Sequence, residues 1–309
     1  MVSRLEKLKI QLKWLHQAQF AGIYVAKEKG YFASLGIDIE ILEGGPNIDS
    51  DQQVLTGVAD IGISLFDRLL VYRNQGLPLI SIAQIVQTST RGLVTKRSSD
   101  IDTPMKMKGK KIGTFGNTDS YQIQAFLREF HLKKHVDIIG QHSIDDFLND
   151  IVDVGSITLY NELQQIFNTG IHPNALNIFL YESYGVGMVE DTLIVREDWL
   201  CKNYNLATRA VAAIIKGWQY AILHQSEATD IVMKYVDPLT TRKLQEKMLA
   251  IISNYISPPQ LPLCNIGEFI LLNLQHTADI LYKYHIISKP ANIQKAIDTT
   301  IVSCTKPHE

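Results

Sequence analysis

The stretch between residues 9 and 45 constrains the fold more than any other part of the sequence. Residues 9–14 alternate apolar and polar side chains, which is typical of a half-buried strand. A polar and aromatic loop follows, and then a short apolar helix over residues 22–29 that Gly30 ends. A second alternating segment, 37–41, stops before Gly44-Gly45-Pro46. The stretch therefore predicts a strand–helix–strand unit whose loop lies at the carboxyl end of the first strand, the edge where open α/β sheets bind ligands.

Length and composition set the broad class of the protein. The chain has 309 residues, 46% hydrophobic and 20% charged, enough to bury the core of one large or two smaller domains. A net charge of −2 provides no basic field for nucleic acid, and no apolar run is long enough to span a bilayer. The first ten residues lack the apolar segment of a secretory leader. We expect a periplasmic or cell-surface protein if a leader has been removed, and a cytoplasmic one otherwise.

The possible metal ligands are scattered. The three cysteines, Cys201, Cys264 and Cys304, do not form a CxxC or Cys/His spacing. His131 and His135 are four residues apart, but no acidic or cysteine partner is near them in the sequence. No metal site is expected.

The strand–helix alternation is repeated along the chain. After the opening unit, strands are predicted over residues 58–64, 79–84 and 93–95, with a helix over 66–74. A second unit begins at residue 111, with strands over 111–114, 136–139 and 154–158. Residues from 197 onward favour helices, the strongest over 207–224, 240–256 and 266–284. This order predicts an α/β protein with two similar lobes, each a mostly parallel sheet flanked by helices, and C-terminal helices packed over a lobe.

Several segments carry a family resemblance: LKWLHQAQFAG with LGIDIEILEGG, then ADIGIS, LVYRNQGLPLISIAQI, MKGKKIGTFG and KGWQYAI. The chain resembles the periplasmic-binding-protein superfamily, in the branch of the yeast thiamine-pyrimidine synthases and the bacterial solute-binding proteins for pyrimidine thiamine precursors, sulfonates and nitrate. The resemblance covers nearly the whole chain. It implies a type II two-lobed fold with a hinge of two crossing strands. Lobe 1 would comprise residues 1–95 plus 192–309, and lobe 2 residues 96–191, with the lobes closing on a solute.

The same resemblance raises an enzyme alternative. The synthases carry a lysine and a nearby histidine on the segment that matches GISLFDR, residues 62–68. An ungapped match places Ser64 at the lysine and Arg68 at the histidine. A Schiff base with pyridoxal phosphate requires an amine, which Ser64 lacks. The cysteine-rich run of the synthases matches GVGMVE, residues 185–190, which has no cysteine. No catalytic residue and no cofactor are therefore expected. Pyridoxal phosphate would be expected only if the synthase alternative holds. A related enzyme that uses other residues is a remaining alternative.

Two residues have the most specific expected roles. In the pyrimidine-binding relatives a glutamate near Glu190 faces the aminopyrimidine, and a carboxylate can pair with an exocyclic amine through charge-assisted hydrogen bonds. The alternative is an exposed turn acid beside Asp191. Trp14 matches a tryptophan shared by this branch, and aromatic faces stack on flat heterocycles; the alternative is a core tryptophan.

Other cleft positions have broader expectations. Gln17 and Gln19 can hydrogen-bond a neutral solute, Phe20 can form a second wall, and Arg91 suits an anionic ligand. The loop at residues 116–120 matches one that holds a phosphate in the synthases, but Asp119 disfavours an anion there, and a plain helix cap is the alternative. Trp218 is expected to be structural. The candidate ligand-binding residues are Trp14, Gln17, Gln19, Phe20, Ser64, Asp67, Thr88, Ser89, Asn117, Thr118, Tyr121, Tyr160, Glu162 and Glu190.

These expectations define a solute-binding protein that closes on a small aromatic heterocycle, a pyrimidine thiamine precursor, for uptake by an ABC permease if the protein is exported. It is expected to be a monomer or weak dimer without nucleic-acid partners. The alternative is a cytoplasmic thiamine-pyrimidine synthase. A further alternative is the ligand-sensing domain of a signalling protein, because LKWLHQAQFAG followed by EGGP also resembles such modules.

Overall fold

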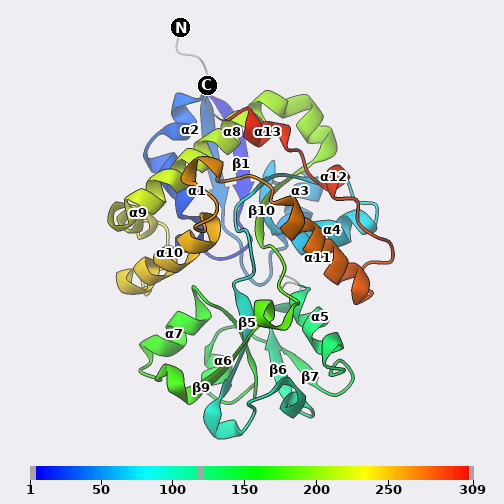
Figure 1. Cartoon of the computed structure of the whole chain (residues 1–309). Coiled ribbons are helices and arrows are strands. Elements are labelled where there is room, and N and C mark those ends of the chain that lie inside the picture. The colour runs from blue at the N-terminus through cyan, green and yellow to red at the C-terminus, as the bar shows by residue number, and fades with distance from the viewer. Residues whose placement is uncertain (1–4, 117–120, 306–309) are drawn as a thin grey trace.

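The computed structural model describes residues 5–116 and 121–305 and has two lobes, one above the other, joined by two chain segments (Figure 1). The upper lobe contains a five-stranded sheet of order β2-β1-β3-β10-β4, and the lower lobe contains a three-stranded sheet, β8-β5-β9, and a pair, β6-β7. The strands of the upper sheet are β1 (Glu6–Gln11), β2 (Ile37–Leu42), β3 (Ile61–Leu65), β4 (Leu79–Gln84) and β10 (Asp191–Arg196). Those of the lower lobe are β5 (Arg91–Lys96), β6 (Lys111–Thr114), β7 (Asp137–Gly140), β8 (Gly155–Thr158) and β9 (Leu176–Leu180).

Helices flank the sheets of both lobes. The upper lobe has α1 (Ala21–Glu28), α2 (Tyr31–Ser34), α3 (Ser50–Leu55), α4 (Phe66–Asn74), α8 (Glu197–Leu223), α9 (Gln225–Val232), α10 (Arg242–Ile256), α11 (Leu271–Lys283), α12 (Ile293–Ala296) and α13 (Thr300–Ser303). The lower lobe has α5 (Gln122–Glu129), α6 (Asp145–Leu148) and α7 (Glu162–Asn168). Two 3₁₀ turns matter below, η1 (Ala18–Phe20) and η6 (Tyr181–Tyr184). The C-terminal helices pack on the upper lobe, as predicted (Figure 1).

The two-lobed α/β prediction is confirmed, but the sheets are mixed rather than mostly parallel. β1 pairs in parallel with β2 and β3, whereas β10 is antiparallel to β3 and β4. The reason is that β10 re-enters the upper sheet from the lower lobe. In the lower lobe β5 is antiparallel to both of its neighbours, whereas β6 and β7 pair in parallel.

The hinge lies earlier in the sequence than the expected boundary at residue 95. β5 is the central strand of the lower three-stranded sheet, so the chain crosses to the lower lobe within residues 85–90 and returns within 186–190. The two crossing segments are hydrogen-bonded: Ile85 N and Val86 N donate to Asp191 O at 2.8 and 3.0 Å, and Glu190 N donates to Val86 O at 3.2 Å.

The opening unit forms as predicted, with one shift that matters for the site. β1 ends at Gln11, three residues before the predicted end, because the backbone of residues 12–14 turns and passes close to Gly44. A Cβ at Gly44 would lie 2.3 Å from Leu12 O. Trp14 therefore lies in the loop rather than on the strand. α8 begins ten residues before the helix predicted at 207; the non-helical backbone of Asn203 (φ −125°, ψ 27°) interrupts its periodicity.

The upper core is closed by α8 packing against α1. Trp218 is 2% exposed there, which confirms its expected structural role. The helices approach through two glycines: a Cβ on Gly217 would lie 1.9 Å from Gly22 O, and one on Gly22 would lie 2.3 Å from the Trp218 ring. This close approach fixes the position of α1, and thus of the loop that precedes it.

Candidate functional site

A pocket lies between the lobes, with about 370 Å³ of space when its mouth toward solvent is included. Its upper wall comes from the loop after β1 and from η1, and its lower wall from the ends of β6 and β8 and the start of α7. It is lined by Lys13, Trp14, Gln17, Gln19, Arg91, Phe115, Thr158, Tyr160, Asn161 and Glu162. The loop singled out in the sequence is therefore one wall of an interlobe site.

Aromatic side chains supply flat surfaces from both lobes. Trp14 is partly exposed and meets Phe115 edge-on, with ring centroids 5.5 Å apart and planes at 73°. Tyr160 is 2% exposed, and its hydroxyl has no hydrogen-bond partner among residues 5–116 and 121–305. Burial raises the pKa of Tyr160 well above its ordinary value, so the phenol stays a neutral donor at physiological pH. Phe115 was not predicted; its position directly after an apolar strand was the available signal.

The upper wall is a polar chain that ends on Asp191. Gln17 Nε2 donates to Gln19 Oε1 at 2.6 Å, and Gln19 Nε2 donates to Asp191 Oδ2 at 2.6 Å. The Lys13 ammonium lies 2.5 Å from Asp191 Oδ1. Lys13 and Asp191 are 8% and 2% exposed. Both glutamines were predicted from the sequence as ligand-binding residues, whereas neither member of this ion pair was.

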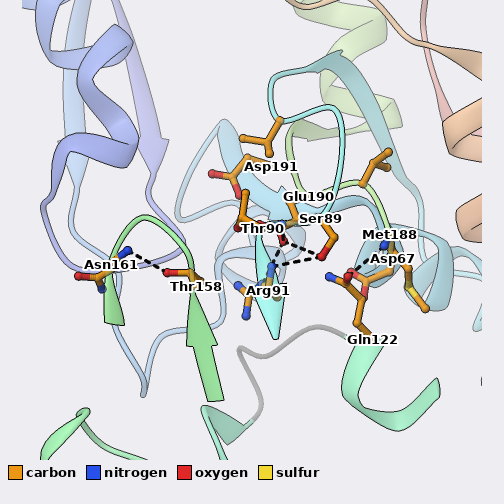
Figure 2. Close-up of polar contacts among 12 residues, drawn as sticks. Asp67, Ser89, Thr90, Arg91, Gln122, Thr158, Asn161, Met188, Glu190 and Asp191 are labelled. Atoms are coloured by element: carbon orange, nitrogen blue, oxygen red, sulfur yellow. Dashed lines mark hydrogen bonds and ion pairs between the residues drawn. The ribbon is translucent and has the colours of Figure 1, made fainter. Parts of the chain in front are cut away.

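The lower wall presents one carboxylate. Glu162 Oε2 accepts hydrogen bonds from Thr158 N at 2.8 Å and Thr158 Oγ1 at 2.7 Å, and its Oε1 accepts from Asn161 Nδ2 at 2.8 Å. Asn161 N in turn donates to Thr158 Oγ1 at 3.3 Å (Figure 2). These donors fix the orientation of Glu162 at the pocket without a cationic partner among the described residues.

Glu190 has a different place from the one expected. It is fully buried in the hinge, where its carboxylate accepts from Thr90 N at 2.7 Å and Thr90 Oγ1 at 2.9 Å (Figure 2). Ser89 Oγ at 3.5 Å and Arg91 Nε at 3.7 Å complete its surroundings. Burial raises the pKa of Glu190, and Arg91 and Lys13 oppose this rise. Glu190 is thus neither a pocket-lining residue nor an exposed turn acid.

The other predicted residues are distributed along the cleft and around it. Ser64 lines a smaller compartment of about 210 Å³, which shares Lys13 with the main pocket. Asp67 is buried and accepts from Tyr121 N at 2.6 Å, and Tyr121 lines a wider part of the cleft between α4 and α5. Thr88 faces a separate groove beside α11. Asn117 and Thr118 lie outside the described residues.

Phe20 is not a wall of the pocket. It is 1% exposed and belongs to the hydrophobic core of the upper lobe. The tight turn of η1 directs its ring away from the cleft into that core, and the same turn places Gln17 and Gln19 at the pocket. The expectation that Phe20 forms a second wall was wrong for this reason, and Phe115 and Tyr160 occupy that role.

A buried acid beside Ser64 predicts a pH-dependent stability. Asp51 is fully buried, bonds Ser64 Oγ at 2.5 Å and pairs with Arg68 Nε at 2.8 Å. Desolvation outweighs Arg68 and raises the pKa of Asp51 to about 6 from 3.8. Between these pH values the folded protein holds a proton that the unfolded chain has released, so stability falls as pH rises from 3.8 to about 6.

In urea titrations at a series of pH values, the stability advantage of the wild type over Asp51→Asn should therefore shrink across that range and level off above it. The difference curve isolates this group from other titrations. A flat difference between pH 4 and 6 would show that the Asp51 pKa is not raised.

Neither a metal centre nor a membrane span is found in the part of the chain that the structure describes. No three His, Cys, Asp or Glu side chains within it come close enough to hold an ion. None of its helices combines the length and the apolarity needed to cross a bilayer.

Two α/β lobes joined by a hydrogen-bonded hinge, with a pocket between them, define the periplasmic-binding-protein-like class. Solved structures of this fold superpose on nearly the whole chain. One, from Bordetella bronchiseptica RB50, covers 97% of this chain and 96% of its own with a TM-score of 0.75 at 19% identity. The periplasmic aliphatic sulphonate binding protein SsuA of Escherichia coli covers 95% of this chain and 92% of its own, with a TM-score of 0.68 at 14% identity.

The family described as NMT1/THI5 like matches residues 17–228, and the chain belongs to this family. The resemblance drawn from the sequence is thereby confirmed. A formylaminopyrimidine-binding protein of Halalkalibacterium halodurans is 23% identical over 84% of this chain and 80% of its own length. A 4-amino-5-hydroxymethyl-2-methylpyrimidine phosphate synthase of Saccharomyces cerevisiae is 29% identical, but the match spans only 41% of this chain and 38% of that protein.

Proposed function

We propose that this protein is a solute-binding protein that closes its lobes on a small aromatic nitrogen heterocycle, of the pyrimidine thiamine-precursor type. The observation that carries the proposal is the composition of the interlobe pocket. Aromatic surfaces from both lobes, Trp14 above and Phe115 and Tyr160 below, surround a space lined by the carboxylate of Glu162, which has no cationic partner among the residues that the structure describes. Stacking on such surfaces contributes about 0.5–1.5 kcal/mol beyond area burial.

In this proposal Glu162 has the role that was expected of Glu190. Its carboxylate is oriented by backbone and side-chain donors, and it can accept hydrogen bonds from an exocyclic amine and a protonated ring nitrogen. The neutral Tyr160 hydroxyl can donate to a ring nitrogen or a carbonyl oxygen. The Halalkalibacterium relative, whose name specifies a formylaminopyrimidine, supports this ligand class.

The proposed physiological role is delivery of the ligand to an ABC permease outside the cytoplasm. The fold shared with a periplasmic binding protein supports this location. In this proposal the protein carries no cofactor, acts as a monomer or weak dimer and performs no chemistry on its ligand. Its function is selective capture by the lobes.

Isothermal titration calorimetry tests the ligand class. The wild type should bind 4-aminopyrimidines in preference to taurine and pyridoxal phosphate. Glu162→Gln should weaken aminopyrimidine binding about 10–100-fold, because a charge-assisted hydrogen bond contributes about 1.5–3 kcal/mol. Trp14→Ala should weaken it about tenfold through lost stacking and contact area.

The matched control is Glu40→Gln, which removes an exposed carboxylate on β2 outside the pocket and should leave the affinity unchanged. Unaltered affinity in Glu162→Gln, with the protein folded, would remove Glu162 from the binding site. Tight binding of taurine in place of pyrimidines would overturn the ligand class.

The synthase alternative rests on the yeast relative, and the residues at the matched position and in the main pocket do not fit a Schiff-base enzyme. Ser64 has no amine, and its hydroxyl is bonded to Asp51. Lys13, which lines the main pocket, is held in a buried ion pair with Asp191, and Lys133 lines the wider part of the cleft outside that pocket. A pyridoxal absorbance band in the purified protein would favour the enzyme over the binder.

A further inference from the structure

Helix α11 connects the hinge of the protein to its lower lobe. Its first half is bonded to both crossing segments: Asn273 Nδ2 donates to Gln87 O at 3.1 Å, and Val189 N donates to Thr277 Oγ1 at 3.1 Å. The loop before it is bonded to the same region, with Gln84 N donating to Gly267 O at 2.9 Å. α11 therefore runs beside the hinge and is fixed to it at several points (Figure 1).

The far end of α11 reaches the lower lobe directly. Tyr284 directly follows α11; its carbonyl oxygen accepts a hydrogen bond from Arg128 Nη1, and its hydroxyl donates to Glu129 Oε2. Lys283 Nζ lies 3.5 Å from Glu129 Oε2. Arg128 and Glu129 form the last turn of α5.

One hydrophobic cluster has members in both lobes near these polar contacts. Tyr284 is 8% exposed and belongs, with Leu281 of α11, to the same hydrophobic cluster as Phe126 and Leu127 of α5. The lobes are thus joined at a place other than the two crossing segments. A rotation that separated α5 from α11 would break two hydrogen bonds and expose this apolar surface.

The contact lies on one side of the cleft. The cleft has two sides (Figure 1). Helices α4, α5 and α11 lie on one side, and α7 and α10 lie on the other. The cleft on the α4–α5 side is a space of about 1370 Å³ lined by Tyr72 above and Ile138 below. The contact between Tyr284 and α5 restricts the widening of the cleft on the α4–α5 side, and it leaves the cleft on the α7–α10 side free to open.

From these contacts we propose that Tyr284, with Arg128 and Glu129, forms an interlobe latch. The latch keeps the lobes together on the α4–α5 side, so that they open toward the α7–α10 side and ligand enters there. It rests on the lobe closure of the proposed function, but not on the identity of the ligand. The latch sets which way the lobes rotate and how readily they separate.

Distance measurement on the protein without ligand tests the latch. Fluorescent labels at Gln75→Cys, near the end of α4, and Ile138→Cys, on β7, report the width of the α4–α5 side. The exposed Cys201, Cys264 and Cys304 are first replaced by serine. Tyr284→Ala removes the ring and the hydroxyl's hydrogen bond to Glu129 but keeps the backbone carbonyl that Arg128 bonds. It should shift the label distances to longer values and raise the ratio of open to closed molecules about 3–10-fold, as the loss of one hydrogen bond would.

The matched control is Tyr282→Ala. Tyr282 is on the same helix and 46% exposed, and its side chain makes no hydrogen bond to the lower lobe among the described residues. This variant should keep the wild-type distances. Tyr284→Phe and Arg128→Gln, which remove single hydrogen bonds and preserve packing, should give smaller shifts in the same direction.

Unchanged distances in a folded Tyr284→Ala, or equal shifts in Tyr284→Ala and Tyr282→Ala, would overturn the latch. If Tyr284→Ala does not fold, unchanged distances in both conservative variants would do so. These outcomes require no ligand. A failure of pyrimidine binding in calorimetry would therefore leave the latch standing, and a failure of the latch would leave the proposed ligand standing.

Discussion

Replacing Lys13 by alanine is expected to lower the free energy of unfolding by about 3–5 kcal/mol, the usual cost of breaking a buried ion pair. Lys13 and Asp191 are both nearly inaccessible, and their charged atoms lie 2.5 Å apart. Without the ammonium, Asp191 remains as a buried carboxylate with Gln19 Nε2 as its principal donor. Urea denaturation at pH 7 measures the loss.

The chain provides a matched control for this variant. Lys9 lies on β1 and pairs with Glu40 at 3.6 Å, with side chains 47% and 59% exposed. Lys9→Ala should cost less than about 1 kcal/mol, because exposed pairs contribute little. The double variant Lys13→Met with Asp191→Leu should recover much of the stability lost in Lys13→Ala. Equal losses in Lys9→Ala and Lys13→Ala would contradict the buried ion pair.

Gly217→Ala is expected to destabilise the upper lobe by about 3 kcal/mol or more, at the upper end of the cost of overpacking a core. The added methyl would lie 1.9 Å from the backbone oxygen of Gly22, so α1 and α8 would have to move apart. Because α1 follows the pocket loop, ligand affinity should fall together with stability. Thermal unfolding and calorimetry on the same sample check both effects.

The control for the glycine variant is Gly140→Ala, at the end of β7. Gly140 is exposed, and a Cβ there would meet no heavy atom within 4 Å. This variant should be neutral or slightly stabilising, because alanine reduces the entropy of the unfolded chain. A neutral Gly217→Ala would mean that the two helices are not in close contact.

Local sequence patterns predicted the elements whose boundaries depend on local chemistry. α4 and β4 were predicted at residues 66–74 and 79–84 and occur at those bounds. The predictions were less accurate for elements whose bounds or direction depend on tertiary contacts. β1 ends early because of the backbone approach at Gly44. The direction of β10 depends on the path of the chain through the lower lobe, which no local pattern encodes.

The site residues were likewise predictable where local sequence determines their position, and not where it depends on distant contacts. Trp14, Gln17, Gln19, Tyr160 and Glu162 line the pocket, and all of them come from loops at strand ends or from the first turn of a helix. Lys13 was missed because a lysine beside a strand usually points to solvent. Its burial depends on the ion pair with Asp191, a residue far along the chain that no local pattern connects to Lys13. Glu190 was wrongly predicted to face the ligand. The family resemblance indicated the segment that carries it, but not the direction in which its side chain points.

The two consecutive acids on the returning segment also bear on the shape of the pocket. Glu190 bonds Thr90, at the start of the lower lobe, whereas Asp191 bonds Lys13 and Gln19 of the upper lobe. The two adjacent carboxylates are thus bonded to different sides of the hinge. The Gln17–Gln19–Asp191–Lys13 chain is therefore bonded within the upper side of the site, so the shape of the upper wall of the pocket does not depend on the position of the lower lobe.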